Sequence, residues 1–411
     1  MASDNPPRWG PRLVVAGLAL LPVGLVAGLV VASELRARRL AEQLLVDAAA
    51  LSRFSRDRPP HREASPGPVA DCLARALDTA PDVSRDAPWM SVPVNEVRAG
   101  RAPLEALPAA ALEALAKHDP WLRETLACTH LTTLAPVPGL GPLAEPLHPR
   151  RQALPRLQEA TASLAPLRVR ALLQHGQHQE ALDVCADGLA LVSDLLWLEG
   201  PEAALGSLGQ STGLATPCAE AVWRAPDDEA RARFVGQLEQ LMREAPPYSH
   251  VMRVERVAQE LRMFGMFFTT EQTARLPPGA RTMVATSASL ARGRQERVGL
   301  ANWWSACDRA FLAVIAAADL SEPSRTRSIL TAQRGFESRW LSLVRVPPLD
   351  VRYQMYAESH EALPMSLELV LAAAALRRGQ PPVTRYIELR GDTLTPKTAE
   401  WRALAIRLPP R

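Results

Sequence analysis

An uncharged apolar segment near the N-terminus constrains this chain more than any other feature. Residues 13–33 contain only Leu, Val, Ala, Gly, Pro and one Ser, with Arg8 and Arg12 before the segment and Arg36 soon after it. About 20 apolar residues in a helix are enough to cross the roughly 30 Å hydrocarbon layer of a bilayer. The sequence therefore predicts a transmembrane helix that anchors the chain through residues 13–33.

A cleaved signal peptide is the alternative interpretation of this segment. Such a peptide has an apolar core of about 7–15 residues and a small-residue cleavage site, and Val31 and Ser33 fit that site. The longer run, followed at once by arginines, favours an uncleaved anchor. Basic residues are nearly balanced across the segment, so they do not decide orientation. Long domains cross largely regardless of charge, and we therefore expect a single-pass protein of the inner (cytoplasmic) membrane whose large domain is periplasmic.

Two glycines of the predicted anchor have the spacing of a helix-dimerisation motif. Gly24 and Gly28 form a Gly-x-x-x-Gly pair, which lets two membrane helices approach closely. The pair predicts a transmembrane dimer face, although glycine is also common in membrane helices that do not pair.

The composition excludes two classes of protein. Of the 411 residues 47% are apolar, which excludes a globally disordered chain, and the net charge of +3 offers no concentrated basic face for nucleic acid. Among the 47 basic residues only Lys117 and Lys397 are lysines. This bias is typical of GC-rich bacterial genomes, so we do not interpret any single arginine as a phosphate clamp.

Proline and glycine clusters divide the chain into five parts. We predict an N-terminal tail, the anchor, a juxtamembrane helix that extends as a stalk and ends in a proline-rich linker, an α-helical domain, and a tail that is extended or forms a β-hairpin. Their bounds are 1–12, 13–33, 34–68, 69–380 and 381–411.

Apolar residues recur at intervals of three and four through the α-helical domain, as they do on one face of a helix. Proline-rich residues 136–149 predict an irregular loop, and Asp227 or Asp228 is placed to cap a helix. The other helices that we expect there cover residues 71–79, 103–117, 121–134, 157–171, 181–196, 205–225, 227–245, 247–268, 300–318, 323–343 and 358–378.

The segment from Ala171 to Ala190 resembles the junction between the two helices of a tetratricopeptide unit. Gly176 lies in the turn, and Glu180-Ala181-Leu182 begins the second helix. The resemblance covers about one repeat, with no second copy at the 34-residue period of that family. It implies an antiparallel helical hairpin. The fold class that we predict is thus all-α: a transmembrane helix, then an irregular helical-hairpin domain with a short β-hairpin tail.

Residues 150–382 also resemble uncharacterised, membrane-anchored helical proteins of GC-rich bacteria. In those proteins a hairpin that ends in Gly-x-x-x-Glu-Ala is followed by more helices, and a late helix ends in a pattern similar to Arg377-Arg378-Gly379-Gln380-Pro381. The resemblance implies a fold and carries no active site.

Five cysteines offer two disulfides if the domain is periplasmic. Cys72 with Cys128, and Cys185 with Cys218, are the pairs that can join neighbouring helices. Cys185 and Cys307 also lie on apolar stripes, as buried free thiols do. With no Cys-x-x-Cys pair, the sequence predicts no zinc or thioredoxin-type site.

The apolar run Met263-Phe264-Gly265-Met266-Phe267-Phe268 suggests a groove. It is apolar nearly all round, which is more than one helix face buries against one neighbour. Met263, Phe264, Met266, Phe267 and Phe268 therefore predict a groove for a partner helix or apolar ligand; core packing is the alternative.

Catalytic motifs are missing from the sequence. It has no Gly-x-Ser-x-Gly, no Walker A loop, no dinucleotide-binding glycines and no His-Glu-x-x-His. His175 and His178 flank a turn, and we expect no metal or cofactor. We therefore expect a membrane-anchored scaffold or binding protein of the bacterial envelope with a protein or peptide partner. The alternatives are an anchored enzyme with an unrecognised site and a lipid-binding protein.

Overall fold

The protein is described here from a computed structural model. The structure describes residues 10–57, 65–86, 89, 91–287, 294–318, 320, 350–397 and 405–407; of these, the side chains of residues 10–23, 84, 86, 202, 286–287, 294–298 and 350–355 are left out of the description. The helix predicted over residues 323–343 lies outside this part of the chain.

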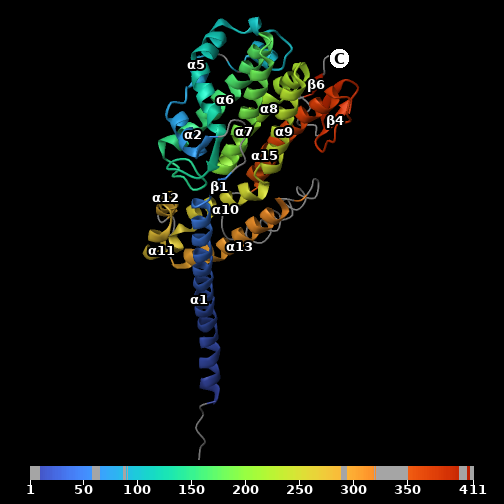
Figure 1. Ribbon diagram of the computed structural model, residues 1–411. Coiled ribbons are helices and arrows are strands. Elements are labelled where there is room, and N and C mark those ends of the chain that lie inside the picture. The colour runs from blue at the N-terminus through green and yellow to red at the C-terminus, as the bar shows by residue number, and fades with distance from the viewer. Residues whose placement is uncertain are drawn as a thin grey trace, which may run out of the picture.

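Helices make up most of the described residues, as the all-α prediction requires (Figure 1). The longer helices are α1 (Gly10–Ser52), α2 (Val69–Asp78), α5 (Ala109–Ala127), α6 (Pro149–Gln174), α7 (His178–Glu199), α8 (Pro201–Arg224), α9 (Asp228–Glu244), α10 (Tyr248–Phe264), α12 (Pro278–Ser287), α13 (Arg294–Ala318) and α15 (Asp350–Arg377). The shorter ones are α3 (Val83–Asp86), α4 (Val92–Arg98), η1 (Leu104–Ala106), η2 (Cys128–His130), η3 (Gly265–Phe267) and α11 (Thr270–Arg275).

Helices α6 and α7 form the antiparallel hairpin that the periodicity predicts. Gly176 makes the turn with φ of +71°, a conformation that glycine adopts without steric cost. Helix α7 is buried on nearly all sides by its neighbours α6, α8 and α9. Asp227 caps α9, because its side chain accepts a hydrogen bond from the Glu229 N–H at 2.9 Å.

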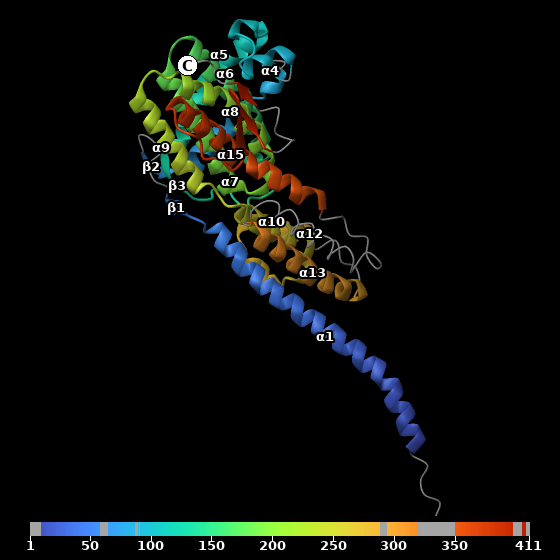
Figure 2. The ribbon, with the colours of Figure 1, turned by 90° about the vertical axis from the view of Figure 1, so that its right-hand side faces the viewer.

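A large core lies between α6, α7, α8 and α15, although α15 is far from the others in sequence. Helix α15 packs along α8 through alanine-rich faces, which allow two backbones to approach closely. The Ser207 hydroxyl donates to the Ser359 carbonyl at 3.0 Å across this contact. The two views agree that α15 runs beside α8 in the upper body (Figures 1 and 2).

Two helices predicted over residues 103–117 and 121–134 are wrong in their bounds. Helix α5 passes through Pro120 without a break and ends at Ala127. Buried Leu115, Leu122 and Leu126 continue one apolar stripe across the proline, so packing offsets the lost backbone hydrogen bond. Residues 131–134 then form strand β3 (Leu131–Leu134), not helix.

Two small sheets complete the fold. Strand β3 lies between β1 (Arg56–Asp57) and β2 (Ser65–Pro68), so the end of the predicted linker is a strand. In the tail, β4 (Ile387–Arg390) and β5 (Thr393–Pro396) form the expected antiparallel hairpin around Gly391 and Asp392. Strand β6 (Ile406–Arg407) adds a third, antiparallel strand to it.

A second, small core joins the C-terminal half of α1 to α10, α12 and α13. Ala37, Ala41, Leu44 and Ala48 are buried in it, so this half of α1 is not the free stalk that we predicted. Its other half projects away from the body (Figures 1 and 2). Leu25, Val26 and Leu29 are exposed there. Within the residues that the structure describes, no helix combines the length and apolarity that crossing a bilayer requires.

A buried charge cluster fastens α1 to this small core. The Arg256 guanidinium of α10 donates to Asp308 of α13 at 2.9 Å and to Asp47 of α1 at 3.0 Å. It also lies 3.4 Å from Glu260, which accepts a hydrogen bond from the Trp304 indole at 3.0 Å. One arginine therefore faces three carboxylates, and burial raises the pKa of Glu260 to about 8.

Candidate functional site

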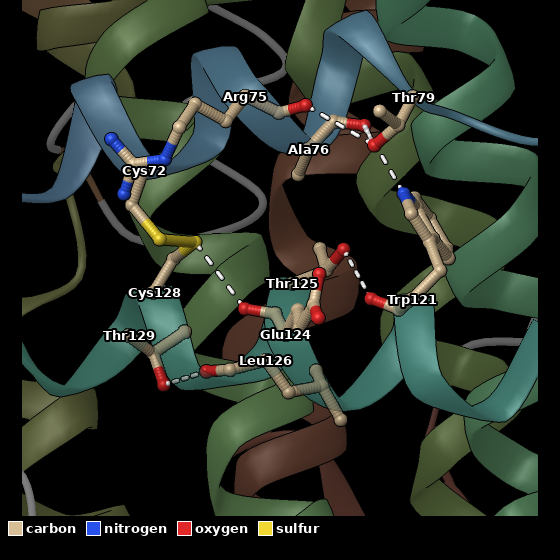
Figure 3. The surroundings of a disulfide bond; sticks show 10 residues. All are labelled: Cys72, Arg75, Ala76, Thr79, Trp121, Glu124, Thr125, Leu126, Cys128 and Thr129. Atoms are coloured by element: carbon tan, nitrogen blue, oxygen red, sulfur yellow. Dashed lines mark hydrogen bonds between the residues drawn. A yellow bond between two sulfur atoms is a disulfide. The ribbon is translucent and has the colours of Figure 1, made fainter.

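The structure contains both cysteine pairs that the sequence suggested. Cys72 of α2 is bonded to Cys128 at the end of α5, with Cα atoms 5.5 Å apart. A hydrogen bond near this disulfide also joins α2 to α5: the Trp121 indole donates to the Ala76 carbonyl at 3.1 Å (Figure 3). Cys185 of α7 is bonded to Cys218 of α8, with Cα atoms 5.6 Å apart. Cys307 is a buried free thiol, and burial raises its pKa.

The Met-Phe run lies in the small core. Phe264 and Phe267 are buried, and the Phe264 ring stacks on Trp304 with centroids 5.2 Å apart. Met263, Met266 and Phe268 are partly buried against the same cluster. This arrangement is the core packing that we gave as the alternative. Trp304 and the helices around it cover the run from more than one side, so a single neighbouring helix is not its only cover.

The remaining residues singled out from the sequence do not converge on one another. A Cβ atom added at Gly24 or Gly28 would have nothing within 4 Å, so this face of α1 is open. The His175 ring lies 2.7 Å from the Ala171 carbonyl. Over the described part of the chain, no three His, Cys, Asp or Glu side chains are grouped as metal ligands would be.

The candidate site is a cavity of about 280 Å³ where the two cores meet, beside the end of α1. The loop over residues 135–148 forms one wall, and the start of α12 forms the other. Five prolines and three glycines line it together with a few larger side chains; the prolines are Pro136, Pro138, Pro142, Pro277 and Pro278. Rigid rings and bare backbone thus enclose a mostly apolar space, which is the usual character of a binding pocket.

A buried ion pair holds this loop in place. Arg151 and Glu199 lie 2.7 Å apart, and both are buried. Glu199 also accepts a hydrogen bond from the Gly141 N–H at 2.6 Å, and Arg151 donates to the Gly141 carbonyl at 3.3 Å. A buried charge that lost its partner would be costly, so Arg151 and Glu199 stay together. Since both hydrogen-bond to the Gly141 backbone, the pair also fixes the position of Gly141.

Close backbone contact holds the opposite wall. A Cβ atom on Gly279 would lie 2.0 Å from the Leu143 carbonyl oxygen, so only glycine fits there. Leu143 itself is buried in the small core, whereas Leu140, three residues earlier, is buried in the large core. The loop therefore bridges the two cores, and the cavity has the shape that this bridge sets.

A nearby cluster of aromatic rings secures the same junction. Phe54, just beyond α1, stacks on Trp197 of α7 with centroids 5.5 Å apart, and His250 of α10 lies 4.6 Å from that tryptophan ring. The Arg56 guanidinium covers Trp197 at 4.7 Å. Burial lowers the pKa of His250, which favours its neutral ring at neutral pH.

Ser52, Glu145 and His148 line the cavity and invite comparison with a hydrolase triad. The Ser52 hydroxyl donates to the Ala49 carbonyl at 2.9 Å, and His148 Nδ1 accepts from the Arg150 N–H at 3.3 Å. The hydrogen bond that joins two of these residues runs between backbone groups, from the His148 N–H to the Glu145 carbonyl at 3.0 Å, whereas a nucleophile needs its base within hydrogen-bond reach.

Sequence reasoning located the loop but missed the site. The proline-rich loop over 136–149 is visible in the sequence, whereas Ser52 and Gly279 come from segments far away along the chain. Pairing of Arg151 with Glu199 across 48 positions carries no local signal either. Comparison with protein-family models, with curated proteins and with solved structures finds no match.

Proposed function

We propose that this chain is a membrane-anchored binding protein of the bacterial envelope, which receives an apolar segment of a partner protein in the proline-lined cavity. The rigid cavity beside the end of α1 is the observation that carries the proposal. Its walls are held in place before any ligand arrives, and preorganised walls lower the entropy cost of binding.

The apolar segment over residues 13–33 supports the anchor. It lies within α1, and its exposed Leu25, Val26 and Leu29 have no protein neighbours to cover them. The two disulfides support a periplasmic domain, because such bonds persist in oxidising compartments and are rare in the cytosol. With this orientation the cavity opens close to the outer face of the inner membrane.

An apolar protein segment is the occupant that the walls favour. Proline rings and Val137, Leu143 and Ala144 offer apolar contact, and the charged or polar side chains at the cavity are few. Proline walls also hold their shape, since each ring fixes one backbone angle. A cavity of about 280 Å³ accommodates one or two side chains of a partner, not a whole helix.

Site-specific photocrosslinking tests this proposal. A photoreactive phenylalanine is placed at Ala144 in the cavity and, as a matched control, at Leu147, which is 72% exposed on the same loop and does not line the cavity. We expect position 144 to yield one discrete product in living cells that maps to an apolar segment of a single partner, and position 147 to yield none. Identical products from both positions, or none from position 144, would show that the cavity is not the binding site.

The two alternative functions have less support. A hydrolase would need acid, base and nucleophile side chains that are hydrogen-bonded to one another, whereas the Ser52 hydroxyl and His148 Nδ1 are hydrogen-bonded to backbone groups. A lipid-binding protein would use the Met-Phe run as a lining, whereas Phe264 and Phe267 pack into the small core.

A further inference from the structure

Three arginines surround a second cavity, of about 350 Å³, between α9 and the C-terminal end of α15. Arg231 comes from α9, and Arg377 and Arg378 come from the last residues of α15 and the position after it. The acidic side chain in its lining is Asp228, which is 88% exposed. The lining therefore carries an excess of positive charge, in a protein whose net charge is only +3.

Among the described residues, the contacts of these arginines leave many of their guanidinium N–H donors without an acceptor. Arg231 donates to the Ala225 carbonyl at 2.6 Å and pairs with Asp228. The Arg377 guanidinium lies over the Trp223 ring at 6.0 Å, and its buried Nε has no hydrogen-bond partner. For Arg377 and Arg378 the described part of the chain shows no carboxylate partner. Guanidinium groups left this way are available to an anion.

Mutual repulsion accompanies the arrangement. Burial is the main cause that lowers the pKa of Arg231, and the positive charges of Arg377 and Arg378 lower it further, while the negative charge of Asp227 opposes the shift. Like charges this close are unfavourable unless something neutralises them. Arginines in the last turn of a helix do favour its negative end, but this accounts for Arg377 and Arg378 and not for the convergence of Arg231 from another helix.

We propose that the cavity between α9 and α15 binds a phosphate-type anion through Arg231, Arg377 and Arg378. A guanidinium presents planar, forked donors that match the oxygens of a phosphate, a phosphate monoester or a sulfate. Three such groups suit a tetrahedral dianion better than a single carboxylate. The alanine and valine side chains between them leave room for an organic group that carries the phosphate.

The position in the molecule favours a soluble ligand over a lipid headgroup. The C-terminal end of α15 leads into β4, in the upper body and away from the free end of α1 (Figures 1 and 2). A membrane that holds α1 would lie at the opposite end. This site is separate from the proline-lined cavity and does not depend on its occupant.

Titration calorimetry on the full-length protein in detergent tests the proposal, with inorganic phosphate and glycerol phosphate as probes at constant ionic strength. We expect binding that Arg378→Gln and Arg377→Gln each weaken by at least about tenfold, since a charge-assisted hydrogen bond contributes about 1.5–3 kcal/mol. Arg378 is exposed, so its replacement leaves the fold intact.

Arg233→Gln is the matched control. Arg233 is on α9, 61% exposed, and lies 3.7 Å from Glu229, outside the cavity. It should bind phosphate as the wild type does. Equal weakening in all three variants, or no heat from either probe, would overturn the proposal. Binding only to phosphatidylglycerol vesicles would also overturn it, because the ligand would then be a lipid headgroup. Crosslinking at Ala144 is unaffected by these variants and reports on the first cavity alone.

Discussion

At the residue scale, Glu260 is a buried carboxyl group whose pKa is strongly raised. It is fully buried, and burial together with Asp308 raises its pKa to about 8, although Arg256 and Trp304 oppose the shift. The single positive charge of Arg256 does not balance the charges of Asp47, Glu260 and Asp308 at once. A protonated Glu260 relieves that excess of negative charge.

The raised pKa predicts a fall in stability as pH rises. Between the unfolded value of 4.5 and the folded value of about 8, the native state binds more protons than the unfolded state, so the free energy of unfolding decreases with pH. We expect the melting temperature of the full-length protein to fall from pH 5 to pH 8, and Glu260→Gln to flatten this dependence. Glu229→Gln, at an 81% exposed position, should keep the wild-type slope. An unchanged slope in Glu260→Gln would contradict the assignment.

The disulfides give a second prediction at this scale. The Cys185–Cys218 bond closes a loop of 33 residues, and a cross-link of this length stabilises a fold by about 3–4 kcal/mol through the unfolded state. The double replacement Cys185→Ala/Cys218→Ala should lower the free energy of unfolding by about that amount, measured by urea denaturation. Its control is wild-type protein under reducing conditions, which should lose at least as much. Equal stability of wild type and variant without reductant would contradict the bond.

Sequence reasoning reached some residues and not others. The cysteine pairs were accessible because few combinations join neighbouring helices, and Asp227 was accessible because a cap acts locally. Arg256 and Glu260 were not, since their partners outside α10 come from α1 and α13, two helices that are far away in sequence. Neighbours at that separation leave no periodic pattern.

At the scale of elements, α1 illustrates what periodicity leaves open. Its apolar positions predict a helix correctly, but the same stripe fits a free stalk and a packed helix equally well. The structure buries Leu44 against the small core and exposes Val46.

We expect Leu44→Ala to destabilise the contact between α1 and the small core by about 2–5 kcal/mol, the range for buried leucine. Val46→Ala, at a 63% exposed position of the same helix, should change stability by less than about 0.5 kcal/mol. Hydrogen exchange of the amides over residues 37–48 measures the difference. Equal protection of these amides in both variants would show that α1 is not held by this contact.

Replacing two glycines by alanine should have opposite effects on stability, because one glycine lies against another backbone segment and the other lies on an open helix face. Gly279→Ala would place a Cβ atom against the Leu143 carbonyl and should distort the proline-lined cavity and lower the melting temperature. Gly236, within α9, has nothing within 4 Å of an added Cβ, so Gly236→Ala should stabilise the protein by about 0.5–1 kcal/mol. Thermal unfolding of both variants checks the opposite signs. Stabilisation by Gly279→Ala would contradict the close contact.

At the scale of the whole molecule, two cores are joined at one rigid loop. The sequence predicted most of the described helices and the loop. It did not predict the division into two cores, because α15 completes the large core from a position well over a hundred residues beyond α8. Contacts of that sequence separation depend on the complete fold, not on any local pattern.

The proposed periplasmic placement predicts a count of reactive thiols. Protein taken from cells, denatured without reductant and treated with a polyethylene-glycol maleimide, should gain one adduct, at Cys307; after reduction all five cysteines should react. The shift in electrophoretic mobility reads the number directly. Five adducts without reductant would place the domain in a reducing compartment and contradict the proposed placement, but not the anion site.

The continuity of α1 has a mechanical consequence. With 43 residues and a rise of 1.5 Å per residue, it is about 65 Å long, and no break separates its apolar half from the half that Arg256 and Leu44 fasten to the small core. In the proposed anchored state, a tilt of its apolar half would therefore be transmitted to the domain. Helices tilt to match the thickness of the bilayer around them, so a thicker or thinner membrane would swing the entire domain and change the direction in which the proline-lined cavity faces.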